Sequence, residues 1–91
     1  MRIRWTLAAA GDLQQIHNYL REHEPHLARP TVIAIREASL SVRKFPNRGS
    51  PGVAEGTREL LHEQLPYIIA YRVREDAVEI LHIRHPSQER Q

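Results

Sequence analysis

The chain of 91 residues is long enough for one domain, which would bury only about 60 % of the surface that the unfolded chain exposes and leaves little room for a deep catalytic cavity. It contains no cysteine, so disulfides and thiolate metal sites are excluded, and this agrees with a reducing cytoplasm. The formal net charge of +2 is too small to identify a nucleic-acid binder, and we find no apolar run of the length that a signal peptide or membrane span needs.

The N-terminal third predicts a short strand followed by a helix. Residues 2–6 alternate arginine with Ile3 and Trp5, the pattern of an edge strand with one apolar face. From Leu7 to about Glu24 the apolar period becomes helical, with Thr6 as the predicted N-cap and Pro25 marking the end. The stripe expected to face the core is Ala9, Leu13, Ile16 and Leu20, and the side expected to face water or a partner includes Asp12, Gln15, Asn18 and Arg21.

A second helix is predicted from about Leu27 or Thr31 to Lys44. Pro30 would be costly deep inside a helix, so we expect the regular part to begin near Pro30 or its first turns to be bent. The expected core face is Val32, Ile35, Ala38 and Val42, broadened by Ile33 and Leu40. Because few residues separate the two helices, they should form an antiparallel hairpin that covers a sheet.

The C-terminal half predicts a loop and then a sheet. Residues 45–56 hold several Gly and Pro and no period, so we expect a loop. Strands are expected at 57–62, at 67–73 in the centre of the sheet, and at 77–85, whereas residues 86–91 should fray. The predicted fold is α+β, one domain over residues 1–91: an N-terminal strand and a two-helix hairpin packed on a three- to four-stranded antiparallel sheet.

Recognisable catalytic motifs are missing from the sequence. We find no nucleophile elbow and no glycine-rich phosphate loop, and the histidine spacings suit no common zinc site, so we expect no metal and no cofactor. Arginine is more informative, because Arg58, Arg72 and Arg84 could lie on one sheet face and bind phosphate. The alternative is that they pair with acids of neighbouring strands, namely Glu59, Glu75 and Glu79.

Several strings, in this order, resemble the ParE branch of the RelE/ParE superfamily of type II toxin–antitoxin toxins. The strings are WTLAAAGDLQQIHNY (5–19), FPNRG (45–49), TREL (57–60), PYIIAYRV (66–73) and VEILHIRH (78–85). The resemblance spans nearly the whole chain, and it implies a helical hairpin against an antiparallel sheet.

The superfamily resemblance implies one of two activities. RelE-like members cleave messenger RNA on the ribosome and place an arginine where this chain has Ile68, which cannot neutralise a developing phosphorane charge. Arg84 and His85 are the weak candidates for residual catalysis. ParE-like members carry apolar residues there and act without enzymatic chemistry, by binding DNA gyrase and stabilising its cleaved DNA complex. The candidate target contacts are Arg48, Arg58, Arg72, Arg84, His85 and Arg90.

The same resemblance implies a ParD-like antitoxin as partner, and a cytoplasmic location. Such an antitoxin would lay an amphipathic segment on exposed parts of Leu20, Val32 or Ile33, although each of these could equally be core. We expect no sequence-specific DNA binding by the toxin alone. Three hypotheses stay open at this point: a gyrase-directed toxin, a ribosome-dependent endoribonuclease, and a non-toxic remnant that only binds its antitoxin.

Overall fold

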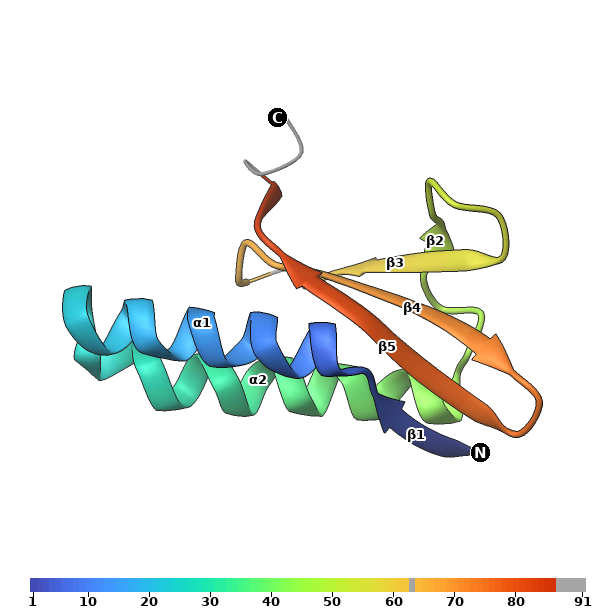
Figure 1. Ribbon diagram of the computed structural model, residues 1–91, viewed down its shortest axis with the longest axis horizontal. Helices are drawn as coiled ribbons and strands as arrows, with labels where there is room; N and C mark the ends of the chain where they lie inside the picture. The colour runs from blue at the N-terminus through green and yellow to red at the C-terminus, as the bar shows by residue number, and fades with distance from the viewer. Residues whose placement is uncertain (63, 87–91) are drawn as a thin grey trace.

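The computed structural model describes residues 1–62 and 64–86 of the chain. Two helices lie side by side along one face of a twisted sheet (Figure 1). In chain order the elements are β1 (Arg2–Trp5), α1 (Leu7–His23), α2 (Pro25–Lys44), β2 (Ser50–Pro51), β3 (Thr57–Leu61), β4 (Ile68–Arg74) and β5 (Ala77–Arg84). The α+β class and the helical hairpin are therefore confirmed. Apart from Pro86, the tail predicted to fray lies outside the described residues.

The sheet differs from the prediction in strand number and direction. It has five strands in the order β1-β5-β4-β3-β2, and β1 runs parallel to β5 whereas the other pairs are antiparallel. The sheet is mixed because the chain re-enters it after the helical hairpin at the opposite edge, in β2, and its last strand, β5, ends up beside β1 and parallel to it. The fifth strand is the two-residue β2, inside the segment expected to be only a loop, where Ser50 pairs with Glu59 of β3.

The helix ends follow from local chemistry. Thr6 is the N-cap of α1, as predicted, and its hydroxyl accepts a hydrogen bond from the Ala9 amide at 3.1 Å. The second helix begins at Pro25, earlier than predicted, because proline is well suited to the first helical position. Pro30 lies inside this helix, where it removes a single amide donor, and the helix continues through it.

The core lies between the helical hairpin and the sheet. Its largest fully buried side chains include Tyr71, Ile35, Ile69, Ile80 and Val42. The apolar run on β4 is buried from Ile68 to Tyr71, which confirms the predicted central strand. Ile33 and Leu40, expected to broaden the core face of α2, are instead exposed. Neither helix in the described part of the chain combines the length and apolar character that crossing a membrane requires.

Candidate functional site

A hollow of about 940 Å³ lies where the end of α1 and the start of α2 meet the C-terminal end of β5. We call it the groove. Its apolar and aromatic lining includes Ile16, Tyr19, Leu20, Leu27, Tyr67 and Ile83, and its polar lining includes Gln15, Glu24 and His85. An apolar lining with polar groups beside it matches an amphipathic segment of a partner chain.

One wall of the groove is fixed by Asp12 of α1. A carboxylate oxygen of Asp12 accepts the backbone amide of Ile83 at 3.0 Å, and Nδ1 of His82 lies 3.1 Å from the same oxygen. A β-bulge makes this contact possible: Ala70 pairs with His82, whereas the next residue of β4, Tyr71, pairs with Ile80. Asp12 was expected to face water or a partner, but it binds β5 because the bulge turns this amide towards α1.

Aromatic side chains form much of the rest of the groove. The Tyr67 ring meets the His85 ring edge to face at 5.8 Å, and Tyr19 stacks on His23 at 4.2 Å. Burial, assisted by the nearby Tyr19, raises the pKa of the Tyr67 phenol above its ordinary value. Tyr67 therefore stays neutral at physiological pH and adds polarity to the groove without adding charge.

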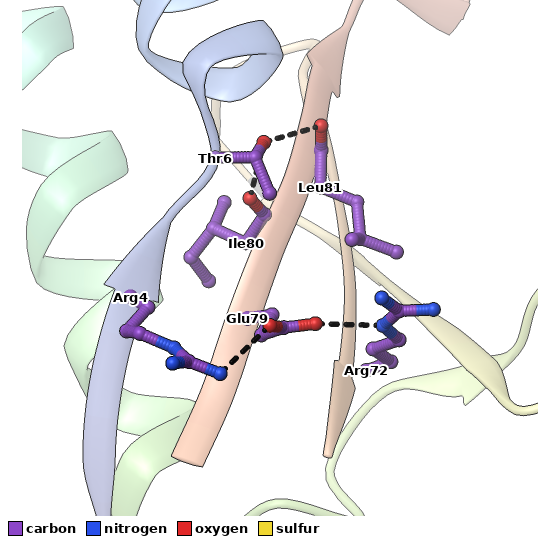
Figure 2. A network of polar contacts seen from close by, with 6 residues as sticks. All are labelled: Arg4, Thr6, Arg72, Glu79, Ile80 and Leu81. Carbon is purple, nitrogen blue, oxygen red and sulfur yellow. Dashed lines mark hydrogen bonds and ion pairs between the residues drawn. The ribbon is translucent and has the colours of Figure 1, made fainter. Parts of the chain in front are cut away.

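The sheet face turned away from the helices carries a row of charged side chains (Figure 2). Glu79 of β5 accepts hydrogen bonds from Arg72 of β4 at 2.7 Å and from Arg4 of β1 at 2.9 Å. The hydrogen bond from Arg72 is the main cause that lowers the pKa of Glu79, and the charges of Arg72, Arg4 and Arg74 act in the same direction. One carboxylate shared by two guanidinium groups leaves the row positive.

A second ion pair crosses the same face nearer the groove. Arg84 of β5 donates to Glu59 of β3 at 2.7 Å. Because β4 lies between these strands, the pair passes over the central strand. This explains why Ile68 and Ala70, whose side chains point away from the helices, are nonetheless buried.

The arginines predicted to share one face are divided between the two faces. Arg72 and Arg84 lie on the outer face, where each binds a glutamate of a neighbouring strand, the alternative that the sequence left open. Arg58 pairs in register with the buried Tyr71 and so lies on the opposite face, because side chains alternate along a strand. Its guanidinium donates to the carbonyl oxygen of Gly49 at 2.6 Å instead of to a carboxylate.

The other predicted contacts are dispersed. Arg48 is exposed in the turn after α2, and Arg90 lies outside the described residues. Of the three predicted antitoxin contacts, Leu20 lines the groove, whereas Val32 and Ile33 of α2 do not. Tyr19, Leu27 and Tyr67 also line the groove, and the sequence did not predict them there. The available signal was Tyr19 beside Leu20, which broadens the apolar stripe of α1 beyond the core.

A helical hairpin on one face of a sheet, with a groove at the hairpin's closed end, places the molecule in the class of small toxins of the RelE/ParE superfamily. Residues 3–90 match the family described as the ParE toxin of the type II toxin–antitoxin system parDE, and the chain belongs to this family.

Relatives and solved structures agree with this assignment. The chain is 41 % identical over 88 residues to the protein Y4kP of Sinorhizobium fredii, covering 97 % of this chain and 91 % of that one. It is 31 % identical to toxin RelE2 of Caulobacter vibrioides, covering 96 % and 97 %. A structure of the chromosomal ParDE system of P. aeruginosa superposes with a TM-score of 0.87 at 30 % identity, over 93 % of this chain and 95 % of that one.

Proposed function

We propose that this toxin inhibits DNA gyrase by binding it and stabilising the cleaved DNA complex, without being an enzyme. The observation that carries the proposal is the environment of Ile68. An RNA-cleaving relative needs a cation at this place to stabilise a phosphorane, but here a buried aliphatic side chain lies beneath the Arg84–Glu59 ion pair. The Arg84 charge is compensated by that carboxylate, which further weakens its candidacy as a phosphate ligand.

The likeness to a ParDE structure supports a ParD-like antitoxin as the neutralising partner. We place one amphipathic segment of this antitoxin in the groove, because the apolar lining there is hydrophobic surface that the described chain leaves open. The exposed Tyr19 and the partly exposed Leu27 would be its principal contacts. The proposal also makes the protein cytoplasmic, where both gyrase and a co-expressed antitoxin are found.

Two substitutions and a matched control test the antitoxin site. Tyr19→Lys and Leu27→Lys should each weaken antitoxin binding by about tenfold or more, because a charge replaces an apolar contact at the centre of the interface. Ile33→Lys introduces the same charge at an exposed position of α2 outside the groove, and it should leave the affinity within about twofold of the parent. A control that weakens binding as strongly as the groove variants would contradict the placement.

Induction of the toxin in cells tests the target. We expect the DNA-damage response to rise while cellular messages stay intact, because stalled gyrase complexes break the chromosome. Rapid cleavage of messages on ribosomes would contradict the proposal in favour of an endoribonuclease. Normal growth after induction, with the protein folded and antitoxin absent, would instead indicate a remnant that has lost toxicity.

A further inference from the structure

The turn that follows α2 is held in one conformation by a buried tyrosine. The Tyr71 hydroxyl accepts the amide of Gly49 at 2.8 Å and donates to the carbonyl oxygen of Pro46, also at 2.8 Å. The turn itself is closed by the Arg48 amide, which donates to the carbonyl oxygen of Phe45 at 3.1 Å. Tyr71 is fully buried, so the turn is attached to the core of the protein and not merely to its surface.

Close packing on the far side of the turn adds to this rigidity. A Cβ atom at Gly49 would come within 2.8 Å of the Glu59 carbonyl oxygen and 2.9 Å of the Tyr71 ring, so only glycine fits. Arg58 donates to the Gly49 carbonyl oxygen from β3. The side chains that the turn exposes are thus presented in a preformed arrangement, which lowers the entropy cost of binding a partner.

Beside this turn, three large apolar side chains are exposed around one hollow of about 550 Å³. They are Met1, Leu40 and Phe45, with 53, 47 and 59 % of their surface accessible. Arg43 and Lys44 line the same hollow. We call this surface the terminal patch, because it lies at the C-terminal end of α2. Single exposed apolar residues need no explanation, but a cluster around a hollow is typical of a contact site.

We propose that the terminal patch is the surface by which the toxin holds its target, and that the target offers an acidic protein surface carrying an apolar anchor. The proposal deepens the function proposed above and rests on it. Two basic side chains beside a single lining carboxylate, that of Glu37, leave the described part of this hollow positive. An acidic partner is therefore attracted, and an apolar side chain can enter the hollow.

The charge and the apolar side chains of the terminal patch also disfavour two other occupants, a second copy of the chain and nucleic acid. A second copy of the chain would bring Arg43 and Lys44 against their own equivalents, which is unfavourable in a symmetric contact. Nucleic acid would satisfy the basic groups through its phosphates but would leave Phe45 and Leu40 without an apolar partner. A protein surface with acidic and apolar groups satisfies both parts of the patch.

The terminal patch and the groove lie at opposite ends of the helical hairpin. Leu27 lines the groove near the start of α2, and Lys44 lines the patch at its end, so about 25 Å of helix separates them. Substitutions at one surface should therefore leave the other intact. This separation allows target binding and antitoxin binding to be tested independently in the same full-length chain.

The test uses Phe45→Ala and the double variant Arg43→Glu/Lys44→Glu, with Arg36→Glu as the matched control. Arg36 is exposed on the same helix but does not line the hollow. Each variant is induced in cells to score growth arrest, purified to measure cleaved DNA complexes with gyrase, and titrated with antitoxin. We expect both patch variants to need about tenfold or more protein for half-maximal arrest and half-maximal cleavage, as for an interface hot spot. Arg36→Glu should stay within about twofold of the parent, and antitoxin affinity should be unchanged throughout.

The outcomes separate this proposal from the gyrase proposal. Patch variants that are folded by circular dichroism and as toxic as the parent would overturn the terminal patch as target site. If the parent arrests growth without trapping gyrase on DNA, the gyrase proposal fails, and the arrest assay still decides whether the patch holds the true target. An equal loss of activity in Arg36→Glu would also overturn the terminal patch as the target site, since a general charge effect would then explain the loss.

Discussion

Replacement of Tyr71 by phenylalanine isolates the contribution of one buried hydroxyl. Tyr71→Phe keeps the ring in the core but leaves the Gly49 amide without its acceptor, and an unsatisfied buried donor costs about 1–3 kcal/mol. The Pro46 carbonyl is only half-buried, so water can replace its lost partner, and we expect no further cost in unfolding free energy from this group. The expected loss is therefore about 2 kcal/mol of unfolding free energy. For a domain of this size it lowers Tm by roughly 8–16 °C.

The assay is urea denaturation, combined with hydrogen exchange of the Gly49 amide. We expect a lower denaturation midpoint at unchanged slope, and faster exchange at Gly49. Tyr19→Phe is the matched control: Tyr19 is exposed, so its change should stay within about 0.5 kcal/mol. If Tyr71→Phe were as stable as the parent and Gly49 remained equally protected, the turn would not depend on this hydroxyl and the reasoning would be refuted.

Three further predictions concern stability. Gly49→Ala should destabilise by about 1–3 kcal/mol because its Cβ meets backbone and ring atoms, whereas Gly11→Ala, in open space on a helix, should stabilise by up to about 1 kcal/mol. Asp12→Ala should cost about 1–3 kcal/mol because the Ile83 amide loses its acceptor, as measured by urea denaturation. The arginines around Glu79, chiefly Arg72, hold the pKa of this carboxyl below its ordinary value. The ionised carboxylate therefore stabilises the fold fully at pH values above the ordinary pKa, and this stabilisation is lost as the pH falls through the lowered pKa. Glu79→Gln should accordingly flatten the acid side of the stability profile.

Each of these has a result that would contradict it. If Gly49→Ala stabilised the protein as Gly11→Ala is expected to do, the close contact at Gly49 would be relieved by small shifts of its neighbours. An Asp12→Ala variant as stable as the parent would show that water replaces the carboxylate at the bulge. A stability profile for Glu79→Gln as steep in acid as that of the parent would assign the acid sensitivity to other carboxylates.

Local patterns were sufficient to predict both helices and four of the five strands of the described sheet. The apolar period of α1, its Thr6 cap and the apolar run of β4 are properties of neighbouring residues, and these predictions are confirmed. The parallel pairing of β1 with β5 joins residues at opposite ends of the chain, so no local period contains it. The two-residue β2 is too short to produce a pattern.

The candidate site was harder to predict because it depends on register. Arg58 and Arg72 look equivalent in the sequence, but only the pairing of Arg58 with Tyr71 reveals that they face opposite sides of the sheet. The contact between Asp12 and β5 depends on a β-bulge, and the pattern of apolar residues from Val78 to Ile83 does not predict this bulge. The identity of the family, in contrast, could be predicted from short strings in the correct order.

The most direct test of the central claim is the amount of cleaved DNA that purified gyrase accumulates on a plasmid in the presence of this toxin. We predict that linear DNA increases with toxin concentration and that adding antitoxin abolishes the increase. If gyrase instead turns over normally while the same preparation cuts messages on purified ribosomes, the chain is an endoribonuclease and the account is wrong.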